Sequence, residues 1–145
     1  AMASGLIAES KLTPELKNEA YYYRAKALLA EGQSKEAMSD LSFLSKDTRN
    51  VYGAEAKYLL AQLYFNAGQT DKAEKEVLDY IEVSTPHAYW LARSFVLLSD
   101  VYMKLGRDLD ARQYLLSLQQ NYQADDDIAG MIETRLAKLN KGSKQ

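Results

Sequence analysis

Residues 61–73 read AQLYFNAGQTDKA, and this stretch decides the fold because it is written three times. The related stretches are AKALLAEGQSKEA at residues 25–37 and SDVYMKLGRDLDA at residues 99–111. Each copy has a glycine followed five residues later by an alanine: Gly32 with Ala37, Gly68 with Ala73, and Gly106 with Ala111. Glycine most readily adopts the left-handed conformation that closes a helix. A unit repeated at a nearly fixed period predicts a stack of helix pairs, each burying its apolar face against its neighbours.

The predicted fold is all-α, an α-α superhelix of three helix pairs followed by one capping helix. Thr13 is expected to cap the first helix at Pro14, and Ser34 and Thr70 to cap the returning helices of the first two pairs. The triple acid at 125–127 lacks the alternating ligands and glycine of a calcium loop, so we interpret it as the cap of the last helix.

The chain is expected to form a single domain over residues 14–140. Within it, the pairs are placed at about 14–47, 51–84 and 87–122, and the capping helix at about 127–140. Residues 1–13 are interpreted as a flexible N-terminus, partly left over from cloning because the chain begins Ala-Met, and residues 141–145 as a disordered tail.

Composition narrows the function classes. Cysteine is absent, which excludes thiol catalysis and disulfides. Eighteen basic residues are spread along the chain against twenty acidic ones, so no nucleic-acid partner is expected. No apolar run approaches the roughly 20 residues of a membrane-spanning helix. The single histidine, His87, argues against multi-histidine metal sites and a catalytic triad, so we expect no enzyme activity, no catalytic residues, no metal site and no cofactor.

These copies resemble the tetratricopeptide repeat, in which small residues stand where helices approach closely and large apolar residues fill the grooves around them. Alignment on the turn glycine places small residues at Ala25, Ala61, Ser99, Ala37, Ala73 and Ala111. The resemblance covers about residues 15–122 and implies a non-enzymatic scaffold that binds a protein or peptide partner.

The copies are longer than the standard repeat. The turn glycines are 36 and 38 residues apart, against about 34. Lengthened repeats of this kind are similar to the C-terminal part of long bacterial cell-envelope tetratricopeptide proteins. That resemblance implies a periplasmic or outer-membrane-associated location.

The resemblance also places a binding groove along the first helix of each pair. The expected contact residues are Tyr22, Lys26, Tyr58, Gln62, Phe65, Asn66, Arg93 and Asp100. Their aromatic rings and amides suit a peptide segment or a partner helix. A tyrosine at helical spacing more often fills the core with its hydroxyl near solvent, so the groove interpretation applies to the set and not to a single residue.

His87, Tyr89 and Trp90 form an aromatic group at the second junction between pairs. This group either packs two repeats together or forms a surface hot spot. Two functions remain open: an interaction scaffold that uses the groove, and a structural C-terminal module that caps a longer repeat array and self-associates as a homo-oligomer.

Overall fold

The computed structural model describes residues 13–83 and 85–143, and these residues form α-helices joined by short loops. The helices are α2 (Pro14–Ala30), α3 (Ser34–Leu44), α4 (Val51–Asn66), α5 (Thr70–Glu82), α6 (Ala88–Lys104), α7 (Asp108–Asn121) and α8 (Ile128–Ser143). The all-α superhelix of three pairs and a capping helix is confirmed. Helix α8 continues to Ser143, beyond the end expected at residue 140.

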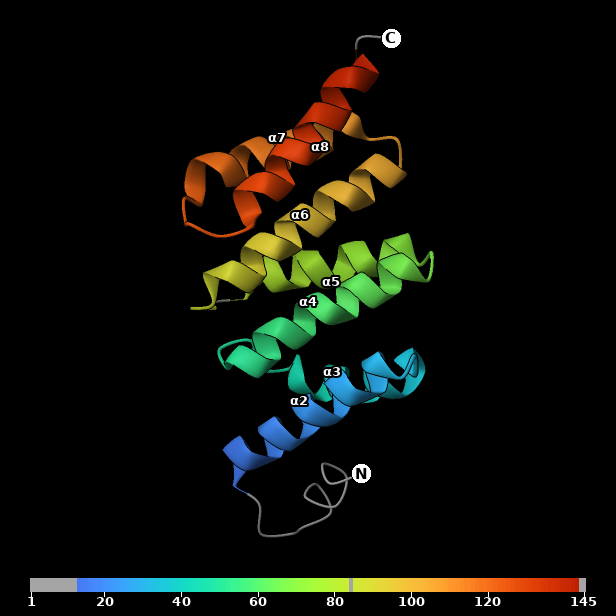
Figure 1. The fold of residues 1–145 in the computed structure, drawn as a ribbon, viewed down its shortest axis with the longest axis vertical. Helices are drawn as coiled ribbons and strands as arrows, with labels where there is room; N and C mark the ends of the chain where they lie inside the picture. Colours follow the sequence, from blue (N-terminus) through green and yellow to red (C-terminus); the bar gives the residue numbers. More distant parts are fainter. Residues whose placement is uncertain (1–12, 84, 144–145) are drawn as a thin grey trace.

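The helices are arranged in two rows (Figure 1). One row contains α2, α4, α6 and α8, and the other contains α3, α5 and α7. Each helix pair packs against the next, so the stack grows along its long axis from α2 to α8. Helix α8 has no returning partner among the described residues, and it occupies the place that the first helix of a fourth pair would take.

The three turn glycines act as predicted. Their φ angles are 77°, 79° and 78°, the left-handed conformation that glycine adopts without strain. In the first turn, the Gln33 amide donates to the Leu28 carbonyl at 2.8 Å and the Gly32 amide donates to the Leu29 carbonyl at 3.1 Å. The other two turns repeat both bonds. This pattern is a Schellman motif, which satisfies the last carbonyls of a helix from within the turn.

The caps match the prediction only in part. Thr13 caps α2, because its hydroxyl accepts from the Leu16 amide at 3.2 Å. The prediction was wrong for Ser34 and Thr70, which are the first helical residues of α3 and α5. Gln33 and Gln69 hold the cap positions without a side-chain bond. The Schellman turn already fixes the chain direction there, so a capping side chain is not required.

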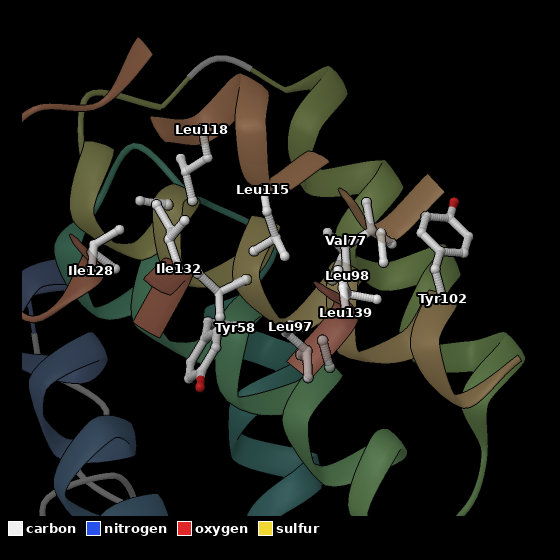
Figure 2. Packing of buried hydrophobic residues seen from close by; sticks show 14 residues of the cluster. Tyr58, Val77, Leu97, Leu98, Tyr102, Leu115, Leu118, Ile128, Ile132 and Leu139 are labelled. Atoms are coloured by element: carbon white, nitrogen blue, oxygen red, sulfur yellow. The ribbon is translucent and has the colours of Figure 1, made fainter. Parts of the chain in front are cut away.

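The six small residues of the repeat pattern are all at the helix contacts. Each is at most 1% exposed. Large apolar residues fill the space around them in two clusters, one centred on α2, α3 and α4 and one running from α4 to α8. Figure 2 shows the second of these clusters. Close approach at small residues with large neighbours is the packing that the sequence predicts.

Gly53, within α4, has a role that the sequence pattern does not reveal. A β-carbon built there would lie 1.9 Å from the Asp47 carbonyl oxygen and 2.6 Å from the Leu44 carbonyl oxygen. Only a residue without a side chain lets α4 pass this close to the end of α3. Gly53 therefore sets the contact between the first two pairs.

The loop before α4 and the loop before α6 are bonded to each other. The Thr85 hydroxyl donates to the Thr48 carbonyl at 2.7 Å. The ring Nε2 of His87 lies 2.9 Å from the Arg49 carbonyl oxygen, to which it donates. These two bonds connect the first junction between pairs to the second.

Candidate functional site

The first part of the expected groove is closed by internal bonds. The Tyr22 hydroxyl donates to Glu55 Oε1 at 2.9 Å, and Lys26 Nζ lies 3.0 Å from Glu55 Oε2. Glu55 is buried. Loss of water around the phenol, together with the neighbouring Glu55 carboxylate, raises the pKa of Tyr22 to about 12. Tyr22 and Lys26 therefore join α2 to α4 through a shared carboxylate.

Tyr58, Gln62 and Asn66 form a chain of hydrogen bonds along α4. The Tyr58 hydroxyl donates to Gln62 Oε1 at 3.0 Å, and the Gln62 amide donates to Asn66 Oδ1 at 2.9 Å. The Tyr58 ring is only 7% exposed, and it belongs to the larger core cluster. Tyr58 thus fits the core-filling interpretation of a tyrosine, with its hydroxyl at the wall of the groove.

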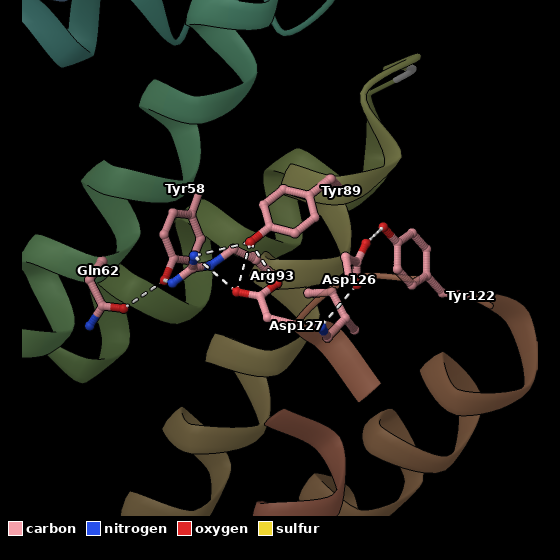
Figure 3. A network of polar contacts seen from close by, with 8 residues as sticks. Tyr58, Gln62, Tyr89, Arg93, Tyr122, Asp126 and Asp127 are labelled. Carbon is pink, nitrogen blue, oxygen red and sulfur yellow. Dashed lines mark hydrogen bonds and ion pairs between the residues drawn. The ribbon is translucent and has the colours of Figure 1, made fainter. Parts of the chain in front are cut away.

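Arg93 joins the groove to the aromatic junction (Figure 3). Its guanidinium lies over the rings of Tyr58, Trp90 and Tyr89, at 4.9, 5.9 and 6.0 Å from their centroids. It also donates to the Tyr58 and Tyr89 hydroxyls, both at 3.2 Å. Stacked aromatic faces and hydroxyl acceptors hold this cation in place. Tyr58 and Arg93 of the expected groove thus form one cluster with Tyr89 and Trp90 of the expected junction surface.

The acidic segment before α8 completes the cluster. The Tyr89 hydroxyl donates to Asp127 at 2.8 Å, and Arg93 lies 4.0 Å from the same carboxylate. Asp126 accepts a bond from the Ile128 amide at 2.9 Å, so one residue of the triple acid binds the first amide of α8. Asp126 also accepts from Tyr122, and desolvation and this carboxylate raise the pKa of Tyr122 to about 12.

His87 is not part of the Arg93 cluster. Its ring bonds the loop before α4 through Arg49, whereas Tyr89 and Trp90 contact each other edge to face with ring centroids 5.1 Å apart. Trp90 also packs on Tyr58. His87 therefore has a structural role in the junction, while Tyr89 and Trp90 belong to the Arg93 cluster.

An open pocket lies farther along the same row of helices. It has a volume of about 530 Å³ and is lined by residues of α4, α6 and α8: Phe65, Asp100, Met103, Lys104, Thr134, Arg135 and Lys138. Asp100 is bound by Arg135 through two bonds, of 2.7 and 2.9 Å. Phe65 and Asp100, both expected groove residues, meet here.

The α8 residues of this pocket are the part of the site that sequence reasoning missed. The repeat pattern ends at residue 122, so it assigns α8 a capping role alone. The available signal was the order of the helices. Helix α8 follows the third pair, where the first helix of a fourth pair would stand, and the resemblance places the groove along first helices. Helix α8 caps the core with one face and lines the pocket with another.

Two absences hold for the described part of the chain. Its acidic and histidine side chains form no group of three or more that could hold a metal ion. None of its helices is long and apolar enough to cross a bilayer.

Comparison with known families identifies the central pair. Residues 54–85 match the family model described as the tetratricopeptide repeat. These residues comprise α4 from Ala54 onward and all of α5. Comparisons with curated proteins and with solved structures return no significant match.

Proposed function

We propose that this chain, a stack of the tetratricopeptide-repeat family, is a non-enzymatic scaffold that binds a peptide segment or a partner helix along α4, α6 and α8. Tetratricopeptide repeats generally mediate protein–protein interaction. The observation that carries the proposal is the open pocket at Phe65, which combines apolar side chains with charged ones on the groove side of the stack. Such a mixture suits a protein partner.

The upstream contacts give this surface a fixed shape. Tyr22, Lys26, Tyr58 and Arg93 are engaged within the protein, so they form a rigid wall. A rigid surface loses little entropy when a partner binds. The groove therefore divides into a preformed wall and an open pocket.

A photo-crosslinker tests the groove. Benzoylphenylalanine at Gln62 on the wall should cross-link a discrete protein in an extract of the source organism, and excess unmodified chain should compete with it. The matched control is benzoylphenylalanine at Gln119, an exposed amide on α7 in the other row. Equal cross-linking from both positions would exclude the groove as the binding surface.

A second candidate function is a structural module at the C-terminal end of a longer stack. It is favoured by the exposed apolar face of α2, where Leu16 is 51% and Tyr23 is 55% exposed. By glycine alignment, Tyr23 corresponds to Leu59 and Leu97, which pack against the preceding pair or within the core. This face of α2 suits a further helix or a second copy of the chain.

Sedimentation across a concentration series tests self-association through this face. Wild-type chain should dimerise as its concentration rises, and Leu16→Lys with Tyr23→Lys should stay monomeric. A wild-type chain that is monomeric throughout would rule out the homo-oligomer. The periplasmic or outer-membrane-associated location stays a prediction, which fractionation of the source cells tests.

A further inference from the structure

The charged residues of the expected groove are paired within the protein, whereas two lysines beside it are not paired in the described part of the chain. Lys26 is paired with Glu55, Arg93 with Asp127, and Asp100 with Arg135. Lys104 and Lys138 also face the pocket, and no ion pair joins either to a carboxylate among the described residues. Positive charge without a counterion is therefore concentrated at the Phe65 pocket.

The same pocket offers apolar contact. Phe65 and Met103 are partly buried and pack against the larger core cluster, and both line the pocket. An aromatic ring and a flexible thioether accept apolar side chains of several shapes. A ligand that satisfies the pocket must supply negative charge and apolar surface within a short distance.

Asp100 does not remove this positive charge. It is only partly buried and stays in the pocket wall with Arg135, which neutralises it. The pocket therefore keeps the surplus charge of Lys104 and Lys138. In a protein partner, the group that matches this charge is an aspartate or glutamate carboxylate.

We propose that the pocket formed by Phe65, Met103, Lys104 and Lys138 binds a peptide in which an aspartate or glutamate side chain stands beside a large apolar side chain. This inference rests on the proposed groove function and specifies the chemistry of its partner. The carboxylate lies between the lysine ammonium groups, and the apolar side chain lies on Phe65 and Met103.

Fluorescence anisotropy with three labelled peptides tests this chemistry. All are acetylated and amidated, so they carry no terminal carboxylate. The first is Gly-Ser-Gly-Leu-Glu-Leu-Gly-Ser-Gly, the second has Gln in place of Glu, and the third has Ser in place of both Leu residues. We expect the first to bind about fivefold to tenfold more tightly than either of the others.

Two variants with the same change in charge separate the pocket from general electrostatics. Lys104→Glu with Lys138→Glu should abolish the preference for Glu over Gln. Lys35→Glu with Lys72→Glu should preserve it, because these lysines line a separate pocket between α3, α4 and α5. Phe65→Ala should weaken the Glu and Gln peptides by the same factor.

The outcomes distinguish this inference from the groove function. Equal binding of the Glu and Gln peptides, weakened by Phe65→Ala, would overturn the carboxylate preference and leave the groove function standing. If both lysine variants lost the preference for Glu over Gln to the same extent, the carboxylate site at this pocket would also be overturned. If none of the peptides binds, the inference is wrong, and the crosslinking from Gln62 decides the groove function by itself.

Discussion

Helices α2 and α8 stand at the two ends of one row, yet they meet solvent differently. Helix α2 exposes Leu16 and Tyr23, whereas the large apolar side chains of α8 in the described residues are buried or half-buried. The exposed side of α8 carries residues such as Glu133, Ala137 and Lys141. The stack is therefore closed at the α8 end and open at the α2 end.

The difference shows that repeats of the same pattern need not contribute equally to stability. The core cluster from α4 to α8 is continuous and contains large residues from five helices, whereas the cluster at α2, α3 and α4 is smaller. In a repeat protein, each pair is stabilised mainly by its neighbours. We expect the open end to unfold locally before the closed end.

The largest loss of stability is expected from Ile132→Ala, which removes a buried side chain at the closed end of the stack. Ile132 is 2% exposed in the cluster that α8 covers. Removal of a buried isoleucine side chain should lower the free energy of unfolding by about 2–5 kcal/mol, measured by urea denaturation with circular dichroism.

Leu109→Ala on α7 is the control, because Leu109 is 78% exposed and its loss should change stability by about 0.5 kcal/mol or less. A similarly small effect at Ile132 would mean that α8 does not close the core. Hydrogen exchange should show faster opening of α6, α7 and α8 in the Ile132 variant.

The next largest changes in stability are expected from alanine substitutions at two helical glycines, Gly53 in α4 and Gly130 in α8. Gly53→Ala places a β-carbon against the Asp47 and Leu44 carbonyls and should destabilise the junction of the first two pairs by about 1–3 kcal/mol. Gly130→Ala in α8 meets no atom within 4 Å. It should stabilise the chain by about 0.5–1 kcal/mol, because alanine restricts the unfolded state.

Thermal unfolding of the two variants should therefore shift in opposite directions. Destabilisation by Gly130→Ala would show that α8 packs more tightly than its open face indicates. A neutral Gly53→Ala would show that the first pair can move away from α4 without loss.

The smallest effect is a loss of stability in alkali. The pKa values of Tyr22 and Tyr122 are raised from 10.0 to about 12 in the folded state, chiefly by desolvation. Their neutral phenols therefore stabilise the fold fully below pH 10, and this contribution is lost as pH rises from about 10 to 12, because the unfolded chain ionises first.

Tyr22→Phe and Tyr122→Phe should each make the free energy of unfolding fall less steeply with pH in this range. The reduction in slope corresponds to at most one titrating proton for each variant. Urea titrations at several pH values measure the slope, and Tyr23→Phe, at an exposed tyrosine, is the control. An unchanged slope in either variant would contradict the contact with Glu55 or with Asp126.

The sequence predicted the features that depend on nearby residues. The glycine turns bond residues five or fewer positions apart, and the small residues mark the helix contacts directly. The contacts of the site depend on stack geometry instead. Arg93 meets Asp127, and Asp100 meets Arg135, across 34 and 35 residues.

Such contacts depend on the rotation of each helix about its axis and on the angle between pairs. No pattern within one helix specifies either quantity. The requirement for glycine at position 53 could not be predicted for the same reason. It arises from the backbone of Leu44 and Asp47, and no feature of the α4 sequence indicates it.

The stack has two edges, one formed by the junctions between pairs and one formed by the glycine turns within pairs. Bending the stack would strain these two edges unequally. At the junction edge, bonds from Thr85 and His87 to loop carbonyls tie the starts of α4 and α6 together. At the turn edge, each Schellman motif bonds within its own pair, and the ion pair between Arg107 and Glu74 is long, at 3.9 Å. We therefore expect the stack to resist bending that separates the junctions more strongly than bending that separates the turns.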